Sequence, residues 1–116
     1  MKELIAKAED LGRLLAGHER FKALIAARDV VRKDSEASQL LRDYDTQARH
    51  VHGLLSQGKP VEVADKRKLA DLEQQMASNE SLKSMAKAQA NFSEMMSRIN
   101  RAIYDKIAPA GEPHEE

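Results

Sequence analysis

Residues 80–107 read ESLKSMAKAQANFSEMMSRINRAIYDKI, and this stretch decides the fold class. Its inward-facing positions recur at alternating steps of three and four residues, which is the period of one face of an α-helix. They are Leu82, Met85, Gln89, Phe92, Met96, Ile99 and Ile103. At a rise of about 1.5 Å per residue, a helix of this length spans roughly 42 Å. We therefore predict one long amphipathic helix that begins after the capping residues Ser78 and Asn79.

The preceding residues predict four more helices. Residues 2–16 and 19–33 both carry apolar stripes at helical spacing, and Gly17 between them is a candidate for a left-handed helix end. One helix bent at this point is the alternative, but two helices fit the pattern better. A third helix of about 22 residues begins after Asp34 and ends before Gly58 and Pro60. Its predicted seam is Ala37, Leu41, Tyr44, Ala48, Val51 and Leu55, and a shorter helix follows at about residues 62–77.

The composition supports an all-α fold and excludes several classes of function. The chain has 116 residues, the size of one domain, and 19 basic residues balance 19 acidic ones. A chain of zero net charge lacks the overall positive field that drives non-specific nucleic-acid binding. Because there is no cysteine, disulfides, thiol nucleophiles and cysteine-held metal centres are excluded. No apolar run is long enough for a signal peptide or a membrane helix, so we expect a cytoplasmic protein without a membrane partner.

From these features we predict a single domain over residues 1–107. Its fold class is all-α, with about five helices, two of them long, packed as an elongated bundle. Residues 108–116 contain two prolines, one glycine and three glutamates, and we expect them to form a disordered polar tail.

No pattern of catalytic or metal-binding residues stands out. His50 and His52 lie two residues apart on one predicted helix, so their side chains point about 200° apart and cannot share a metal ion. No helix contains a Glu-x-x-His motif, and no glycine-rich phosphate loop or Gly-x-Ser-x-Gly sequence is present. We therefore expect no enzymatic activity, no cofactor and no bound metal.

The two long helices are better suited to assembly. A helix that cannot bury its apolar stripe within a small chain usually buries it against a neighbour. We predict a homodimer, or a heteromer with a related chain, whose interface includes Phe92, Met96, Ile99 and Ile103. The competing interpretation is that the methionines pack in the core of the chain itself and do not contact a partner.

The densest basic run is the second candidate site. Lys66, Arg67 and Lys68 follow one another, and they could contact RNA directly. Acidic neighbours dilute the positive charge, and a solvated helix face explains the same residues. We therefore expect direct nucleic-acid binding to be the less favoured alternative to protein–protein contacts.

The order of short motifs resembles the YlbF/YmcA family of small bacterial helical regulators. The matching segments are residues 8–13 (AEDLGR), 21–24 (FKAL), 34–37 (DSEA), 40–44 (LLRDY), 57–60 (QGKP), 69–72 (LADL), 78–80 (SNE), 88–89 (AQ) and 99–103 (INRAI). The resemblance spans nearly the whole chain, from about Lys2 to Ile107. It implies a cytoplasmic five-helix protein without catalytic residues.

The resemblance also implies a regulatory role. The best-known family members form an accessory complex for a ribonuclease in mRNA processing, and they influence competence, biofilm formation and sporulation in Gram-positive bacteria. A ribonuclease-associated protein is therefore an expected partner. Iron–sulfur clusters held by cysteines are associated with that complex, and this property cannot carry over to a chain without cysteine.

Overall fold

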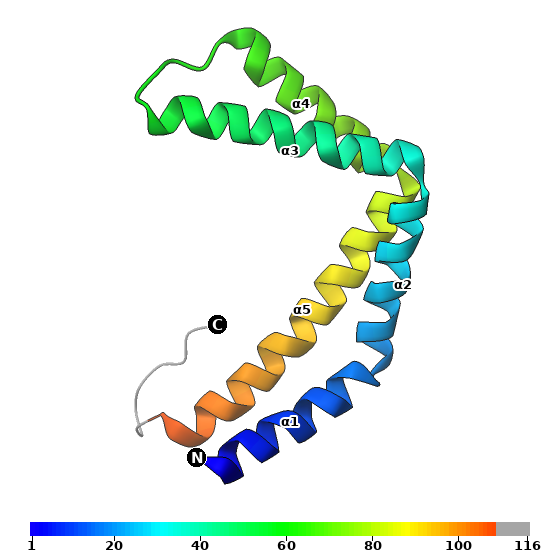
Figure 1. Cartoon of the computed structure of the whole chain (residues 1–116), viewed down its shortest axis with the longest axis vertical. Coiled ribbons are helices and arrows are strands. Elements are labelled where there is room, and N and C mark those ends of the chain that lie inside the picture. Colours follow the sequence, from blue (N-terminus) through cyan, green and yellow to red (C-terminus); the bar gives the residue numbers. More distant parts are fainter. Residues whose placement is uncertain (109–116) are drawn as a thin grey trace. The chain divides into compact units, whose positions relative to one another are not determined.

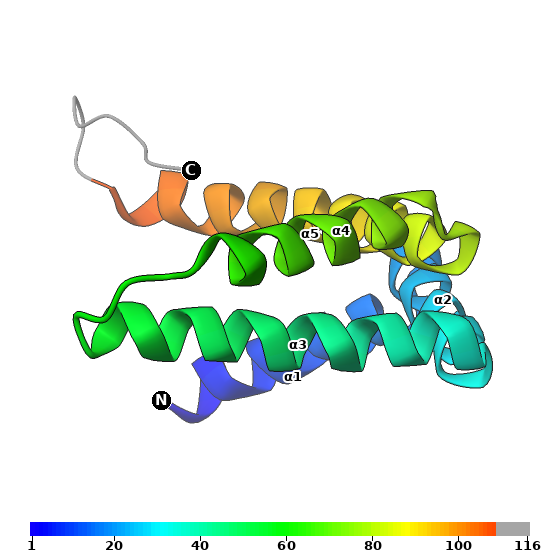
Figure 2. The same ribbon diagram turned by 90° about the horizontal axis from the view of Figure 1, so that it is seen from above.

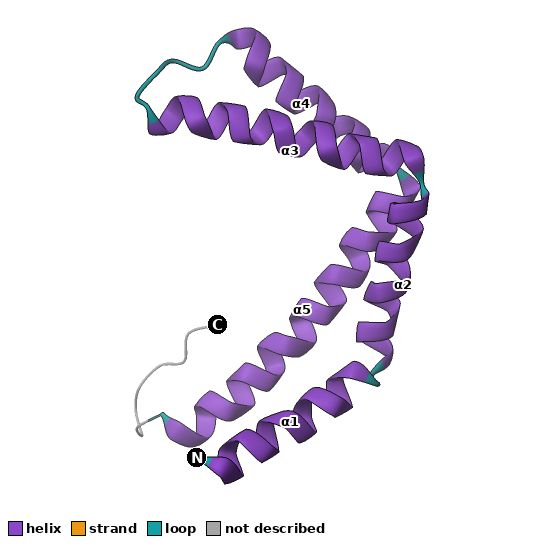
Figure 3. Ribbon diagram, viewed as in Figure 1, coloured by secondary structure: helices purple, strands orange, loops and turns teal. Residues whose placement is uncertain are grey.

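The computed structural model describes residues 1–108, which form five α-helices and contain no strand (Figures 1 and 3). The helices are α1 (Lys2–Ala16), α2 (Glu19–Lys33), α3 (Ser35–Ser56), α4 (Val63–Ser78) and α5 (Glu80–Ile107). The all-α prediction is confirmed, and the observed bounds lie within one residue of the expected ones. The predicted disordered tail, residues 108–116, lies outside the described part of the chain except for Ala108.

The chain divides into two compact units, and the division falls within α2 and within α5. The first unit contains α1, the start of α2 up to Ala26, and α5 from Ala86 onward. The second unit runs from Ala27 to Met85 and contains the rest of α2, all of α3 and α4, and the first residues of α5. Each unit is described separately below.

The core of the second unit is made by apolar side chains from four helices. α3 and α4 lie side by side and run in opposite directions (Figures 1 and 2). The buried cluster consists of Val31, Ala37, Leu40, Leu72 and Leu82, with Leu41, Tyr44, Met76 and Met85 packed against it. Within this unit, the end of α2 and the start of α5 therefore share one core with the α3–α4 pair.

The buried face of α3 agrees only in part with the predicted seam, since Ala37 is buried and Leu41 and Tyr44 pack against the core. Leu40 and Gln47 are buried, whereas Leu55, which the prediction placed inward, is 64% exposed. The actual seam passes through Ala37, Leu40 and Gln47, so it contains a polar residue that an apolar pattern overlooks. Gln47 is satisfied because its Nε2 donates to the Asp65 carbonyl oxygen at 3.0 Å.

The turn after α3 was correctly located, and its geometry explains the glycine. Gly58 has a φ of 67°, a left-handed conformation that side-chain-bearing residues rarely adopt. The Gly58 N–H bonds to the Leu55 carbonyl at 3.1 Å and the Lys59 N–H to the Leu54 carbonyl at 2.9 Å. These two bonds form a Schellman motif, which satisfies the last carbonyl groups of the helix.

The prediction that Gly17 adopts a left-handed conformation is wrong. Gly17 has a φ of −91° and stays in the right-handed region, with its N–H bonded to the Arg13 carbonyl. The next helix begins at Glu19, so only two residues separate α1 from α2. A short bend suffices here, whereas the chain must turn back on itself after α3.

Three helix ends meet around Asp34 in the second unit. Asp34 caps α3 by accepting the Ala37 N–H at 3.2 Å, and its second carboxylate oxygen accepts the Ser81 hydroxyl at 2.7 Å. The Ser81 hydroxyl and the Ala37 amide hold the pKa of Asp34 below its ordinary value. Asn79 caps α5 by accepting the Leu82 N–H at 3.0 Å. Of these contacts, the Asp34–Ser81 hydrogen bond joins the end of α2 and the start of α3 to the start of α5.

Fewer buried side chains stabilise the first unit than the second unit. Leu24 on α2 is 1% exposed and Ala88 on α5 is 9% exposed. Phe21 and Phe92 contribute a tilted ring contact with centroids 5.7 Å apart. By contrast, α1 contains no buried residue. No helix within residues 1–108 combines the length and the apolar character needed to cross a membrane.

Candidate protein–protein interaction surface

Large apolar side chains remain in contact with solvent in the first unit. On α1, Leu4 is 68% exposed, and Ile5 and Leu14 are also exposed. On α5, Ile103, Tyr104 and Ile107 are exposed as well. An amphipathic helix normally gains its stability by burying its apolar face, but on α1 only Leu11 and Leu15 are half-buried and no residue is fully buried. Leu14 lies nine residues after Ile5, on the opposite side of α1, so we call only the other five residues the exposed apolar surface of the first unit.

The four residues of the predicted interface have different environments. Phe92 is half-buried and packs against Phe21, while Met96 and Ile99 are also half-buried. Ile103 is 52% exposed. The first part of the predicted stripe therefore contributes to internal packing, and its end at Ile103 is available to a partner.

Arg20 fixes the start of α2 to α5, and the sequence patterns did not identify it. Its Nη1 donates to the Asn91 carbonyl oxygen at 3.0 Å and to Glu94 Oε2 at 2.9 Å. Arg98 lies 3.6 Å from the other carboxylate oxygen of Glu94. Arg20 and Glu94 are 74 residues apart in sequence, so no local spacing could have predicted this pair.

A shallow groove of about 500 Å³ lies beside this contact, within the first unit. Met95, Ile99 and Ala102 supply its apolar lining at steps of four and three residues along α5. Its polar lining is supplied by His18, Arg20 and Arg98. We call this feature the basic groove.

The predicted RNA-contact residues lie on α4 in the second unit. Lys66, Arg67 and Lys68 are all exposed. Arg67 and Lys68 line a groove of about 520 Å³ that also contains the carboxylates of Asp43 and Asp71. The basic run is therefore mixed with acidic groups in three dimensions, as it is in the sequence.

Asp65, which precedes the basic run, contacts α3. Its backbone carbonyl and side chain accept hydrogen bonds from Gln47, and its Oδ2 lies 3.3 Å from His50 Nε2. His50 nevertheless remains exposed, and so does His52. The two histidines of the pair thus have different neighbours, and only His50 contacts α4.

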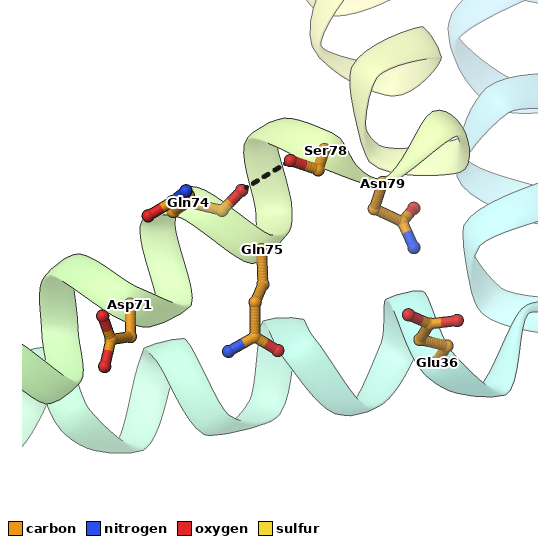
Figure 4. Close-up of a pocket in the computed structure, with 6 residues that line it drawn as sticks. All are labelled: Glu36, Asp71, Gln74, Gln75, Ser78 and Asn79. Carbon is orange, nitrogen blue, oxygen red and sulfur yellow. Dashed lines mark hydrogen bonds between the residues drawn. The ribbon is translucent and has the colours of Figure 1, made fainter.

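A polar groove of about 420 Å³ lies between α3 and α4 (Figure 4). Its lining residues are Glu36, Asp71, Gln74, Gln75, Ser78 and Asn79. The Ser78 hydroxyl donates to the Gln74 carbonyl oxygen at 3.1 Å, a bond within α4. The Ser78 hydroxyl is therefore engaged with the helix backbone. Among residues 1–108, no group of three or more His, Asp or Glu side chains is arranged to hold a metal ion.

Comparison with known proteins identifies relatives along most of the chain. Residues 4–108 match the family model described as control of competence regulator ComK, YlbF/YmcA. The chain is 24% identical over 106 residues to a UPF0342 protein of Streptococcus uberis, covering 91% of this chain and 95% of the relative. It is also 24% identical over 108 residues to a UPF0342 protein of Streptococcus pneumoniae, covering 93% and 96% of the two chains.

A solved structure shares the fold. The crystal structure of Bacillus subtilis RicA in complex with RicF contains a similar chain, with a TM-score of 0.77 and 16% sequence identity. The similarity covers 87% of this chain and 90% of that one. At this level of identity, the similarity establishes the all-α fold.

Proposed function

The chain belongs to the YlbF/YmcA family, and from this premise we propose that it is a non-enzymatic regulatory adaptor that acts through helix-mediated contacts with other proteins. Its finer role would be that of an accessory factor for ribonuclease-dependent mRNA processing and developmental regulation in the bacterial cytoplasm. RicA, the structural neighbour, occurs in a complex with RicF, which supports a partner protein for this chain as well.

One observation carries the proposal: α1 is a helix of 15 residues with none of them buried. Its exposed leucine and isoleucine side chains would lose their contact with water in a complex. Each square ångström of apolar surface removed from water contributes about 25 cal/mol. An unburied amphipathic helix is thus a more specific sign of a partner than scattered exposed leucines, which are common on monomers.

The expected partner is a second copy of this chain or a related family member. Helices with complementary apolar stripes pack readily against each other, and a few large side chains usually supply most of the affinity. The exposed apolar surface of the first unit would form this contact together with Ile99. The half-buried Phe92 and Met96 would support it from within the chain.

Ile99 and Ile103 offer a direct test. Replacing both with glutamate places charges in the proposed contact, so we expect the complex to dissociate while the chain stays helical. The assembled mass is measured by light scattering at tens of micromolar, and folding by far-UV circular dichroism. Because Ile99 is half-buried, Ile103→Glu alone is the milder variant, and it should weaken assembly by at least about tenfold.

Leu55→Glu is the matched control, because Leu55 is also exposed but lies on α3 in the second unit. It should leave the assembled mass unchanged. A folded Ile99→Glu/Ile103→Glu protein with wild-type mass and partner binding would refute the proposed surface. A strictly monomeric wild-type chain would instead exclude the homodimer and leave the heteromer to be tested by capture.

The ribonuclease role has its own experiment. Untagged protein, captured from the native host with an antibody against this chain, should bring ribonuclease machinery or another YlbF-like chain with it. The Ile103→Glu variant should lose that material, whereas Leu55→Glu should retain it. Recovery of neither class of protein from wild-type cells would contradict the accessory-factor proposal.

Direct RNA contact through Lys66, Arg67 and Lys68 is the second candidate function. It is favoured by the position of Asp65, whose carboxylate interacts with α3 instead of neutralising the basic run. RNA binding through these residues would weaken steeply with salt, because phosphate contacts release counterions. Absence of binding to single-stranded RNA at low salt would remove this candidate.

A further inference from the structure

We propose that the basic groove of the first unit binds an acidic amphipathic segment of a partner protein, with an apolar side chain on the groove floor and a carboxylate paired with Arg98. This inference rests on the proposed adaptor function and adds the chemistry of the partner. It concerns the groove lined by His18, Arg20, Met95, Arg98, Ile99 and Ala102.

The floor of the groove suits a helical segment. Met95, Ile99 and Ala102 form one apolar stripe along α5, and the small Ala102 side chain leaves room at one end. Shallow apolar grooves on helices commonly accept the apolar face of another helix. Met95 adds an adaptable side chain, which is frequent at surfaces that accept a partner.

The polar lining offers hydrogen-bond donors. Arginine has five N–H donors and no acceptor, so Arg20 and Arg98 can only donate. His18 Nδ1 accepts the Arg20 backbone N–H at 3.1 Å, so the ring's remaining nitrogen, Nε2, is the one that can donate. The groove thus has donors on each polar side chain that lines it, which favours a partner rich in acceptors.

The local charge balance also favours a carboxylate. Glu94 is shared between Arg20 at 2.9 Å and Arg98 at 3.6 Å, so one carboxylate faces two guanidinium groups. Arg98 keeps 74% of its side chain exposed, which leaves it accessible to a second carboxylate. Such a carboxylate would form a charge-assisted, bidentate pair.

The two grooves of the second unit have a different character. One contains Asp43 and Asp71 beside its basic residues, and the other contains Glu36 and Asp71. In the basic groove every ionisable lining residue is basic. It also has no aromatic residue on which a nucleic-acid base could stack, so an acidic peptide fits it better than single-stranded RNA.

Three labelled helical peptides test the proposal by fluorescence anisotropy. They share one pattern of leucines and differ only in flanking residues, which are glutamate, glutamine or lysine. At about 50 mM salt, where screening is limited, the glutamate peptide should bind at least tenfold more tightly than the glutamine peptide. Arg98→Glu should weaken the glutamate peptide by about tenfold and favour the lysine peptide instead.

Arg49→Glu is the matched control. Arg49 is 80% exposed and pairs with Asp45 four residues earlier, as Arg98 pairs with Glu94, but it lies on α3 in the second unit. This variant should bind the glutamate peptide like wild type. Equal binding of the three peptides, no binding of the glutamate peptide up to about 1 mM, or the same loss in both variants would overturn the proposal.

Further results distinguish phosphate recognition by the groove, failure of the groove proposal alone, and failure of the adaptor function. If a single-stranded RNA binds and is lost in Arg98→Glu while the glutamate peptide does not bind, the groove recognises phosphate and the proposal is wrong. If partner capture still depends on Ile103 but the peptides do not discriminate, only the groove proposal fails. If the wild-type chain is monomeric and its capture also brings no partner, the adaptor function fails as well.

Discussion

Among single residues, Asp34 makes contacts at the junction of three helices. One carboxylate oxygen caps α3, and the other accepts a hydrogen bond from Ser81 on α5. The sequence predicted the cap, because Asp is a preferred residue directly before a helix. It could not predict the Ser81 contact, which joins residues 47 positions apart.

The Asp34 contacts predict a dependence of stability on pH. Hydrogen bonds from Ser81 and Ala37 lower the pKa of Asp34 in the folded state, and a bond from Lys33 lowers the pKa of Asp29. Both groups therefore stabilise the fold above their unfolded pKa of about 4, and this contribution is lost as the pH falls through the folded values. Thermal melting followed by circular dichroism from pH 6 to about pH 2.5 should show a falling midpoint.

The Asp34→Asn variant removes the charge at residue 34 but keeps a side chain that can cap α3. Asparagine still caps a helix but does not titrate, so this variant should lose part of the pH dependence while keeping most of the helix stability near neutral pH. Asp34→Ala removes both effects and should lower the midpoint by several degrees at pH 7. An unchanged pH profile in Asp34→Asn would show that Asp34 does not contribute to the acid response.

At the scale of elements, the helix bounds could be predicted, but the packed face of α3 could be predicted only in part. Capping residues and breakers mark helix ends through local hydrogen bonds and backbone conformation, as at Asp34 and Gly58. The choice of buried face depends on which side meets α4. Of the predicted seam, Leu41 and Tyr44 pack against the core but Leu55 is exposed, while Gln47, whose partner lies on α4, is buried.

Gln47 provides a prediction for the α3–α4 contact. It is 6% exposed, and its amide donates to the Asp65 carbonyl oxygen. Gln47→Ala should reduce the free energy of unfolding by roughly 1–3 kcal/mol, because a hydrogen bond and packing are lost together. Urea denaturation followed by circular dichroism measures this change.

Gln39→Ala is the control for the Gln47 experiment. Gln39 lies on the same helix, but its hydrogen bonds to Asp43 and Arg42 are on the exposed surface. We expect a change within about 0.5 kcal/mol. A similar effect of both substitutions would mean that helix propensity, and not the contact with α4, explains the result.

At the scale of the whole molecule, the two units share two continuous helices. α2 and α5 each extend across the division between the units, at residues 26–27 and 85–86. Their hydrogen-bond ladders connect the stability of one unit to that of the other, because helix formation is cooperative. We therefore predict that the chain unfolds as a single domain.

Leu24 and Leu40 test this cooperativity, since each is buried in a different unit. Leu24→Ala and Leu40→Ala should each destabilise the protein by about 2–4 kcal/mol through loss of core packing. In scanning calorimetry, both should shift one common transition to lower temperature. Two separate transitions, each sensitive to only one substitution, would show that the units unfold independently.

The helices, their ends and the family could be inferred from the sequence, because apolar periodicity, capping residues and motif order are local properties of the chain. Tertiary structure alone decided three other features: the inward position of Gln47, the Arg20–Glu94 pair, and the solvent exposure of α1. These depend on contacts between residues far apart in sequence, or on the absence of such contacts. The stripe that opens at Leu82 is one continuous pattern in sequence, yet it is buried at Leu82 and exposed at Ile103. Burial at each position depends on whether another helix lies beside it, and the period of the stripe carries no information about that.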